Sequence, residues 1–358
     1  MSGRDVPIRQ RALRSHNLAV VLRHVADRRG GVSRAAIAAH SGLTKATVSA
    51  IVDELVAGGL VSFSASADNG GVGRPAPRVT LAGARPVGLG MEINVDYVAA
   101  CVLDLSGAVR HRQVFDSPPL APAAAVAALA SLAENACAAA QSEGLTIARG
   151  VVAVPGLVEG TTVHLAPNLD WHEVTLPASL AGIDLSFGNE ANLAALGELH
   201  ATGLPSFLYV SGEIGIGAGI VFHHQILPGT RGWAGELGHV TVDPDGRACR
   251  CGSQGCLEQY AGKHAMRSVE EAASALGVAL SSAVNLLDLP TVVLGGHLAP
   301  LAPLVDAELR GRVLTAKWAP PTIRASTLGS DAAIIGAART VTQAIIDDPA
   351  AYLTSIRA

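Results

Sequence analysis

Residues 235–258 read GELGHVTVDPDGRACRCGSQGCLE, and four metal-binding side chains fall within eighteen positions of this stretch. One imidazole and three thiolates make a closed tetrahedral set for Zn²⁺ that leaves no ligand position open to water. Gly252 and Gly255 allow the tight turn that brings the last two cysteines to one ion. Because clustered cysteines in a cytosolic protein indicate a metal before a disulfide, we predict one structural zinc ion per chain. The predicted ligands are His239, Cys249, Cys251 and Cys256.

Outside this stretch, charge is distributed unevenly along the 358 residues. Residues 1–85 hold 12 Lys and Arg against 5 Asp and Glu, whereas the rest of the chain holds 14 against 25. A basic first part on an acidic body is typical of nucleic-acid-binding proteins, although an ordinary solvated surface can produce a similar asymmetry. The composition, 49% apolar and 16% charged, is that of a globular protein and excludes disordered and fibrous classes.

The basic first part shows the spacing of consecutive short helices. Apolar residues from Leu18 to Val25 recur at i, i+3, i+4 and i+7, which predicts a first helix. Ser33 and Thr44 are suitable N-caps for a second and a third helix. We therefore predict a winged helix-turn-helix domain over residues 1–82, with a three-helix protein-docking module as the alternative.

Two predicted strands, at residues 60–63 and 78–81, flank the glycine-rich loop 65–77 and form the wing. The apolar stripe of the third helix faces inward, so the residues at its N-terminal end face outward, where a recognition helix meets the major groove. Arginines in the wing and before the first helix are placed to contact phosphate or the minor groove. The predicted DNA contacts are Arg9, Arg11, Arg14, Ser33, Thr44, Lys45, Ala46, Thr47, Ser49 and Arg74.

An alanine-rich tract at about residues 121–140 is long enough to raise the question of a membrane span. It consists mostly of weakly apolar alanine and contains Ser131, Glu134 and Asn135, so we interpret it as a helix of a soluble protein with no membrane partner. The N-terminal arginines are not followed by an apolar run. We therefore expect no signal peptide and a cytoplasmic location.

Several short motifs resemble those of the ROK family of repressors and sugar kinases, and in particular its winged-helix transcription factors. The resemblance covers nearly the whole chain, and the cysteine stretch is its most specific part. The other motifs are Val154-Pro155-Gly156, Ala166-Pro167-Asn168-Leu169, Gly188-Asn189-Glu190-Ala191-Asn192, Gly235-Glu236-Leu237-Gly238-His239 and Val292-Val293-Leu294-Gly295-Gly296.

This resemblance implies an α/β fold in which the winged helix precedes a two-lobed, actin-like (RNase-H-like) domain of the sugar-kinase type. Apolar strand candidates alternate with alanine-rich helical stretches, which is compatible with such a fold. The predicted parts are a winged helix over 1–82, a first lobe over 83–188 joined by a C-terminal helix at about 331–358, and a second lobe over 189–330 with the zinc motif and the sugar site.

The resemblance also implies a sugar site, because carboxylates and amides pair well with neighbouring sugar hydroxyls. His239 would then both ligate zinc and lie beside the sugar, and Glu258 would be held by Cys256, so the metal would keep two sugar contacts in register. The alternative for Glu236 and Glu258 is that they are solvated surface carboxylates. The positions that match the family's sugar contacts are Asn168, Asn189, Glu190, Glu236, His239 and Glu258.

The phosphate-binding motifs of ROK kinases are altered in this chain. Where the kinases carry Asp-x-Gly-x-Thr, this sequence has Glu92, Asn94 and Asp96, and Glu213-Ile214 replaces a Gly-Thr pair. A carboxylate facing the phosphates repels them. Glu190 replaces the catalytic Asp, and its extra methylene displaces the base by about 1 Å, which costs on the order of 100-fold in rate. We therefore expect no ATP-dependent phosphotransfer and no catalytic residue.

Together these patterns predict a sugar-responsive transcriptional repressor of carbohydrate metabolism. We expect it to bind a palindromic operator as a homodimer or homotetramer, since symmetric oligomers match symmetric half-sites. Two alternatives are a zinc-containing ROK sugar kinase with an accessory DNA-binding domain, and an adaptor whose body binds another protein, such as a sugar-transport component. The motifs do not specify the sugar, the operator or the sign of regulation.

Overall fold

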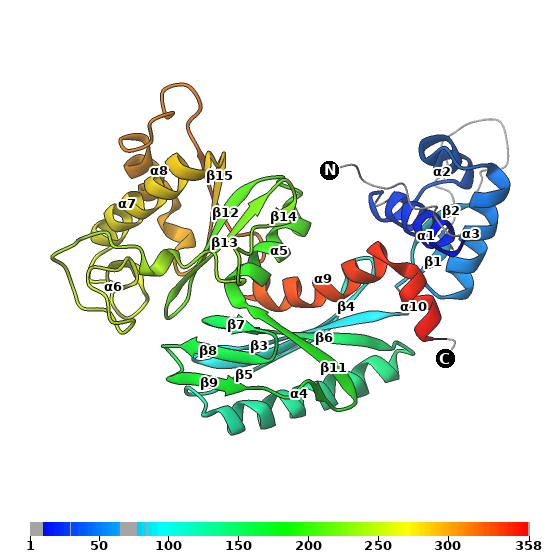
Figure 1. Ribbon diagram of the computed structural model, residues 1–358, viewed down its shortest axis with the longest axis horizontal. Helices are drawn as coiled ribbons and strands as arrows, with labels where there is room; N and C mark the ends of the chain where they lie inside the picture. The colour runs from blue at the N-terminus through cyan, green and yellow to red at the C-terminus, as the bar shows by residue number, and fades with distance from the viewer. Residues whose placement is uncertain (1–9, 29, 65–76, 84, 357–358) are drawn as a thin grey trace, which may run out of the picture.

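A computed structural model describes residues 10–28, 30–64, 77–83 and 85–356. At one end of the molecule, three helices and a two-stranded hairpin form the N-terminal domain (Figure 1). Ser33 Oγ accepts a hydrogen bond from the Ala36 backbone N–H at 3.2 Å, and Thr44 Oγ1 accepts one from that of Thr47 at 3.1 Å, so both predicted N-caps are confirmed. The elements are α1 (Gln10–Ala26), α2 (Arg34–Ser41), α3 (Lys45–Ala57), β1 (Val61–Ser64) and β2 (Arg78–Leu81).

The first lobe is built on a mixed sheet with the strand order β10-β11-β6-β3-β4-β5. An antiparallel meander, β3-β4-β5, is extended beyond β3 by β6 and β11, which run parallel to it. A small antiparallel sheet, β7-β8-β9, adjoins it. The strands are β3 (Val87–Ile93), β4 (Tyr97–Asp104), β5 (Val109–Asp116), β6 (Ile147–Val154), β7 (Leu157–Glu159), β8 (Thr162–Ala166), β9 (Trp171–Thr175), β10 (Ser179–Leu180) and β11 (Ile183–Asn189).

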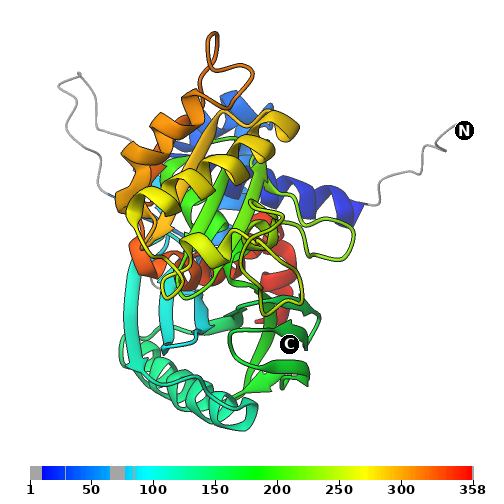
Figure 2. The ribbon, with the colours of Figure 1, turned by 90° about the vertical axis from the view of Figure 1, so that its left-hand side faces the viewer.

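The second lobe repeats this plan in the order β14-β13-β12-β15-β16, and the lobes lie one above the other (Figure 2). Here β12-β13-β14 is the meander, and β15 and β16 add to β12 in parallel. The repeated order is the actin-like plan that the resemblance implied, while the predicted domain boundaries stay a prediction. The elements are β12 (Phe207–Gly212), β13 (Ile216–Phe222), β14 (Gln225–Ile226), β15 (Thr291–Gly296), β16 (Thr322–Ala325), α6 (Glu258–Ala261), α7 (Val269–Leu287) and α8 (Ala302–Arg310).

Between the lobes, α5 (Glu190–Thr202) packs against α9 (Ala332–Asp347), and α9 also covers one face of the first sheet. A Cβ on Gly336 would lie 1.7 Å from the Leu193 carbonyl oxygen, so only glycine permits this helix crossing. Glu198 on α5 is completely buried, and its carboxylate accepts hydrogen bonds from the backbone N–H groups of Thr327 and Leu328 and from two hydroxyls of the same loop. Helices α5 and α9 therefore form one rigid unit.

This unit reaches the winged helix through the C-terminal end of the chain. The Arg23 side chain on α1 donates to Asp347 Oδ1 at 3.0 Å, at the end of α9. Helix α10 (Pro349–Ser355) follows, and its Leu353 is buried in the same apolar cluster as Leu55 of α3. The N-terminal domain is thus attached to helices that belong to the core of the two lobes.

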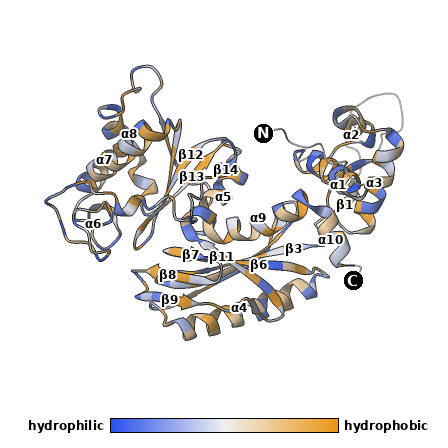
Figure 3. Ribbon diagram, viewed as in Figure 1, coloured by the Kyte–Doolittle hydropathy of each residue, from blue (hydrophilic) through white to orange (hydrophobic). Residues whose placement is uncertain are grey.

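Among the described residues, α4 (Pro122–Ser142) is the one helix whose length and composition would allow it to cross a membrane. It is mainly hydrophobic along its length (Figure 3). However, Ala125, Leu129 and Leu132 form a buried face that packs on the first-lobe sheet. This is the arrangement of a core helix that uses one face for packing.

Candidate functional site

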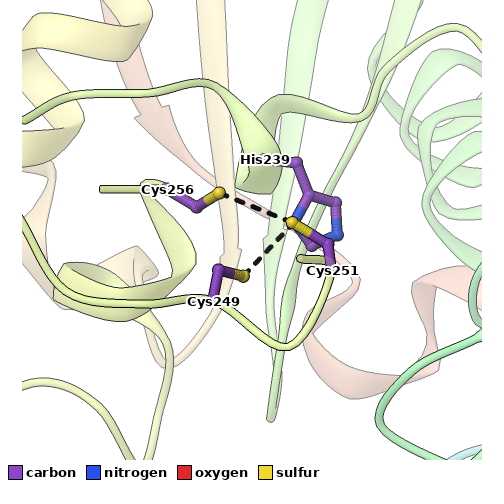
Figure 4. A group of neighbouring side chains, drawn as sticks. All are labelled: His239, Cys249, Cys251 and Cys256. Atoms are coloured by element: carbon purple, nitrogen blue, oxygen red, sulfur yellow. Dashed lines mark hydrogen bonds between the residues drawn. The ribbon is translucent and has the colours of Figure 1, made fainter. Parts of the chain in front are cut away.

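The four predicted metal ligands converge on one point beside the second lobe (Figure 4). Their ligand atoms all lie within 4.8 Å of one another, with Cys251 Sγ 3.7 Å from Cys256 Sγ and His239 Nδ1 3.8 Å from Cys249 Sγ. In a tetrahedron with metal–sulfur bonds of about 2.3 Å, neighbouring sulfurs are about 3.8 Å apart. The four side chains are therefore close to the spacing that one tetrahedral metal ion requires.

The backbone of the cysteine loop makes this convergence possible. His239 ends a short 3-10 helix (Leu237–His239), and the cysteines lie in the loop that leads to α6. Gly255 has φ +69°, and a Cβ there would lie 1.6 Å from the Asp243 carbonyl oxygen. The loop folds tightly on itself at this point, as predicted from its glycines.

All six predicted sugar contacts line a single cleft of about 320 Å³, which is a volume suited to a small ligand. They come from segments far apart in the sequence: the loop after β8, the end of β11, the start of α5, the 3-10 helix and the start of α6. The metal ligand Cys251 lines the same cleft, so the metal group forms part of its wall. The six residues are Asn168, Asn189, Glu190, Glu236, His239 and Glu258.

Asn189 and Glu190 mark the junction between the first-lobe sheet and α5. The Asn189 amide donates to the Gly156 carbonyl oxygen at 3.0 Å, and its Oδ1 caps α5 by accepting from the Asn192 backbone N–H at 3.1 Å. The Ser211 hydroxyl donates to Glu190 Oε1 at 3.2 Å. Any movement of α5 relative to β11 and β12 therefore changes the positions of both predicted sugar contacts.

Glu258 and Asn168 face each other across Gly215, at the turn that precedes β13. A Cβ on Gly215 would lie 2.6 Å from both Asn168 Nδ2 and Glu258 Oε2, so the glycine leaves room for the two side chains to approach. Glu258 is 8% exposed, and its Oε2 accepts a hydrogen bond from the Ile216 backbone N–H at 3.1 Å. The alternative that Glu258 is a solvated surface carboxylate is wrong.

The cleft has an acidic character. Burial, followed by the charge of Glu213, raises the pKa of Glu190 to about 7, although the Ser211 hydrogen bond opposes this shift. Burial also raises the pKa of Glu213 and that of Glu236. Among the residues that line the cleft, all of which the structure describes, none is Lys or Arg. A neutral ligand therefore fits this cleft better than an anion does.

The predicted DNA-binding face consists of the N-terminal end of α3. Lys45, Ala46 and Ala50 are exposed, while Thr47 and Ser49 are partly exposed beside them. Arg14 lies at the contact between α1 and α3, where its guanidinium pairs with Glu54 at 2.5 Å. Ser33 and Thr44 act as helix caps, which leaves their hydroxyl oxygens engaged with backbone. Arg9, Arg74 and the side chain of Arg11 lie outside the described residues.

Comparison with known proteins agrees with this architecture. A model of the ROK family matches residues 88–271, just over half of the chain. The chain belongs to the ROK family. A model of the MarR family matches residues 19–70, which lie in the winged helix-turn-helix domain.

ROK relatives of this chain include both repressors and kinases. It is 36% identical over 264 residues to a putative xylose repressor of Caldicellulosiruptor sp. (strain Rt8B.4), and the match spans 71% of this chain and 65% of that protein, less than two thirds of its length. It is 28% identical to a glucokinase of Streptomyces coelicolor over 70% of this chain and 96% of the enzyme. A solved ROK family transcriptional regulator, a homolog of the E. coli MLC protein, has the same fold with a TM-score of 0.77 at 21% identity, covering 96% of this chain and 99% of that one.

The segment that corresponds to the first phosphate loop of ROK kinases begins at Glu92, near the end of β3. Glu92 is only 1% exposed and does not face the cleft, because Asn94 Nδ2 and the Tyr97 hydroxyl both donate to its Oε1 at 2.9 Å. Burial and then the charge of Glu190 raise the pKa of Glu92 well above its usual value, which favours the uncharged acid. The Glu92 carboxylate is therefore not exposed to a ligand in the cleft. Asn94 and Glu213 do line the cleft.

Ser211 is the cleft residue that sequence reasoning missed. It is 4% exposed, lines the cleft and is the hydrogen-bond donor to Glu190. Its position near the carboxyl end of β12 was the available signal, because ligands of α/β sheets collect at that edge.

Proposed function

We propose that this ROK protein is a sugar-responsive transcriptional repressor, in which the winged helix binds operator DNA and the cleft binds an effector sugar. The convergence of all six predicted contacts on one cleft, from widely separated segments, carries this proposal. The family match and the repressor relatives support it. We further propose a cytoplasmic homodimer or homotetramer that reads a palindromic operator, because one winged helix contacts one half-site.

The connection between the sites runs through helices. Helix α5 begins at Glu190 in the cleft, Glu198 binds it to the loop before α9, and α9 ends at Asp347, which pairs with Arg23 of the winged helix. Sugar would favour one arrangement of the lobes, and α9 would carry that arrangement to the DNA-binding domain. By thermodynamic reciprocity, operator DNA would then weaken sugar binding by the same factor.

We infer that the metal is a structural zinc ion, since three thiolates and one imidazole are the donors that zinc prefers. When bound, zinc would supply four bonds that order the loop between His239 and Glu258. The same loop contributes Cys251 to the cleft wall. The residues of this chain would then bind and orient the sugar, while the metal holds them in place.

We also propose that the chain does not transfer phosphate from ATP. Glu213 in the cleft would repel phosphate, and no lysine or arginine of the lining compensates for it. Release of ADP that requires both sugar and ATP, and that disappears in Glu190→Ala, would overturn this proposal. It would favour the kinase alternative, which the similarity to a glucokinase supports.

Binding to DNA tests the first half of the function. The full-length chain is expected to retard a fragment of its own promoter region at low salt, and the matching sugar is expected to release it. The Lys45→Ala substitution is expected to lower the affinity for DNA. The magnitude of the slope of the logarithm of the DNA-binding constant against log salt is expected to fall by about 1 per bound domain, because one phosphate contact is lost. Lys317→Ala, at an exposed residue of the second lobe, serves as the control and changes neither quantity. Absence of retardation with the unaltered chain would end the repressor hypothesis.

Thermal unfolding in the presence of sugars tests the second half. A matching neutral sugar among xylose, glucose and N-acetylglucosamine is expected to raise Tm, since a ligand at 100 times its Kd adds about 2.7 kcal/mol to the stability of the native state. The 6-phosphates of glucose and N-acetylglucosamine are expected to leave Tm unchanged, because the cleft offers carboxylates and no cationic side chain. Stabilisation by a phosphate but by no neutral sugar would contradict the proposed ligand class, and an adaptor would respond to none of them.

A further inference from the structure

A second hollow adjoins the sugar cleft and shares lining residues with it. It has a volume of about 610 Å³ and lies between the β3–β4 turn of the first lobe and the region of α6 in the second. Asn168 and Glu258 line both spaces, together with Val95 and Ile214. The two side chains that we assign to sugar binding therefore stand at the boundary between an inner and an outer compartment.

The outer compartment continues past Asn168 toward the surface. A further hollow of about 520 Å³ shares Asn168, Pro119 and Arg250 with it. We call the two adjoining hollows that lie beyond Asn168 and Glu258 the outer groove. A ligand in the inner cleft that reaches past Asn168 and Glu258 therefore enters the outer groove.

The lining of the outer groove combines donors, acceptors and apolar surface. Arg250 and His264 are exposed there, and neither has a hydrogen-bond or ion-pair partner among the residues that the structure describes. Asp96 provides a carboxylate, and Pro119 and Ile214 provide apolar surface. Side chains of this kind bind the alternating hydroxyl groups and C–H faces of a sugar ring.

An anionic ligand fits this groove less well. Lys263, the cation nearest to Asp96, is already paired with that carboxylate at 3.4 Å between Nζ and Oδ2. Glu258 stands at the inner end of the groove, and Asp170 lines its outer part. Carboxylates therefore line the groove beside Arg250 and His264. The groove lacks the net positive lining that a phosphate or carboxylate ligand requires.

We propose that the outer groove is a binding site for a second glycosyl unit, so that the effector is a disaccharide or longer saccharide rather than a monosaccharide. This inference rests on the proposed function of the inner cleft. One terminal ring binds in the inner cleft, the glycosidic linkage lies beside Asn168 and Glu258, and the next ring contacts Arg250 and His264.

Calorimetric titration of the zinc-loaded full chain tests this proposal with paired probes: xylose against xylobiose, and glucose against cellobiose. For the matching sugar, the disaccharide is expected to bind at least about tenfold more tightly than the monosaccharide, the effect of a few additional net hydrogen bonds. In Arg250→Ala/His264→Ala this preference is expected to fall to less than about twofold, while the Kd of the monosaccharide stays the same.

Two controls keep the result specific. Arg250 stands between two metal ligands in the sequence, so the zinc content of the double variant is measured and is expected to remain one ion per chain. Arg324→Ala removes an exposed arginine of β16 outside the groove and is expected to keep the preference. Equal affinities for monosaccharide and disaccharide, or a preference that survives the double substitution, would refute the outer site and leave the repressor proposal standing. Failure of every saccharide to bind would instead count against the inner sugar site itself.

Discussion

Cys256→Ser is expected to abolish metal binding and to weaken sugar binding by about 100-fold, while operator binding persists. Cys256 is completely buried and is one of four grouped ligands, and Glu258 follows it at the boundary of the cleft. Changes to groups that hold a binding residue in place typically cost 10–100-fold in affinity, and loss of the ion also releases the loop that carries Cys251. None of the four candidate metal ligands belongs to the apolar cluster that contains the winged-helix core, so the affinity of this domain for DNA is expected to change little.

Three measurements on the same sample check this result: zinc content, the Kd of the matching sugar and retardation of operator DNA. Cys256→Ser is expected to contain no zinc, to bind the operator, and not to be released from the operator by sugar. Cys137→Ser, which alters a cysteine outside the metal group, is the matched control and keeps zinc and the sugar response. Removal of zinc from the unaltered chain with a chelator is expected to reproduce the variant. A metal-free protein with normal sugar affinity would show that the metal does not support the cleft.

Glu190→Gln is expected to make the folded protein more stable above pH 7 and to reduce sugar affinity. The pKa of Glu190 is raised to about 7 by burial and by Glu213, whereas an unfolded chain gives it a value near 4.5. The native state therefore holds this proton more tightly than the unfolded state does. Its contribution to stability is fully present below pH 4.5 and is lost as pH rises through 7, which amounts to about 3 kcal/mol. Glutamine cannot ionise, so the variant escapes this loss.

Urea unfolding at pH 5 and pH 8 measures the effect. The stability of Glu190→Gln minus that of the unaltered chain is expected to increase by about 2–3 kcal/mol between the two pH values. Glu134→Gln, at an exposed position of α4, is the control, and its difference is expected to be the same at both pH values. The matching sugar is expected to raise the Tm of Glu190→Gln less than that of the unaltered chain, because an amide accepts fewer hydrogen bonds from sugar hydroxyls. A pH-independent difference in stability would contradict the assigned burial of Glu190.

Much of the local structure was predictable from the residues themselves. The caps at Ser33 and Thr44 and the helix spacing of the first domain depend on contacts within a few positions of the chain, so they can be recognised without a fold. The same holds for the metal group, whose cysteines lie close together in sequence and whose donor chemistry selects the ion. The family motifs then connected these local features to a known architecture.

Other properties depended on segments that meet only in the folded chain. Ser211 comes from β12, yet it donates to Glu190 at the start of α5, and Arg14 of α1, whose side chain is 58% exposed, is paired with Glu54 of α3. Glu92 matches a phosphate-loop position of the kinases, but hydrogen bonds from Tyr97 and Asn94 hold its buried carboxylate away from the cleft. The contacts of Ser211 and Arg14 follow from long-range packing, which residue spacing does not encode, and the fold also buries the strand that carries Glu92.

The His/Cys stretch at residues 235–258 thus specifies its own candidate metal ligands, because spacing and thiolate chemistry suffice for that choice. Tertiary packing places those ligands against a cleft that also contains Asn168 and Glu190 from distant parts of the chain. It also raises the pKa of Glu190 toward neutrality, since desolvation and the charge of Glu213 exist only once the lobes have folded together.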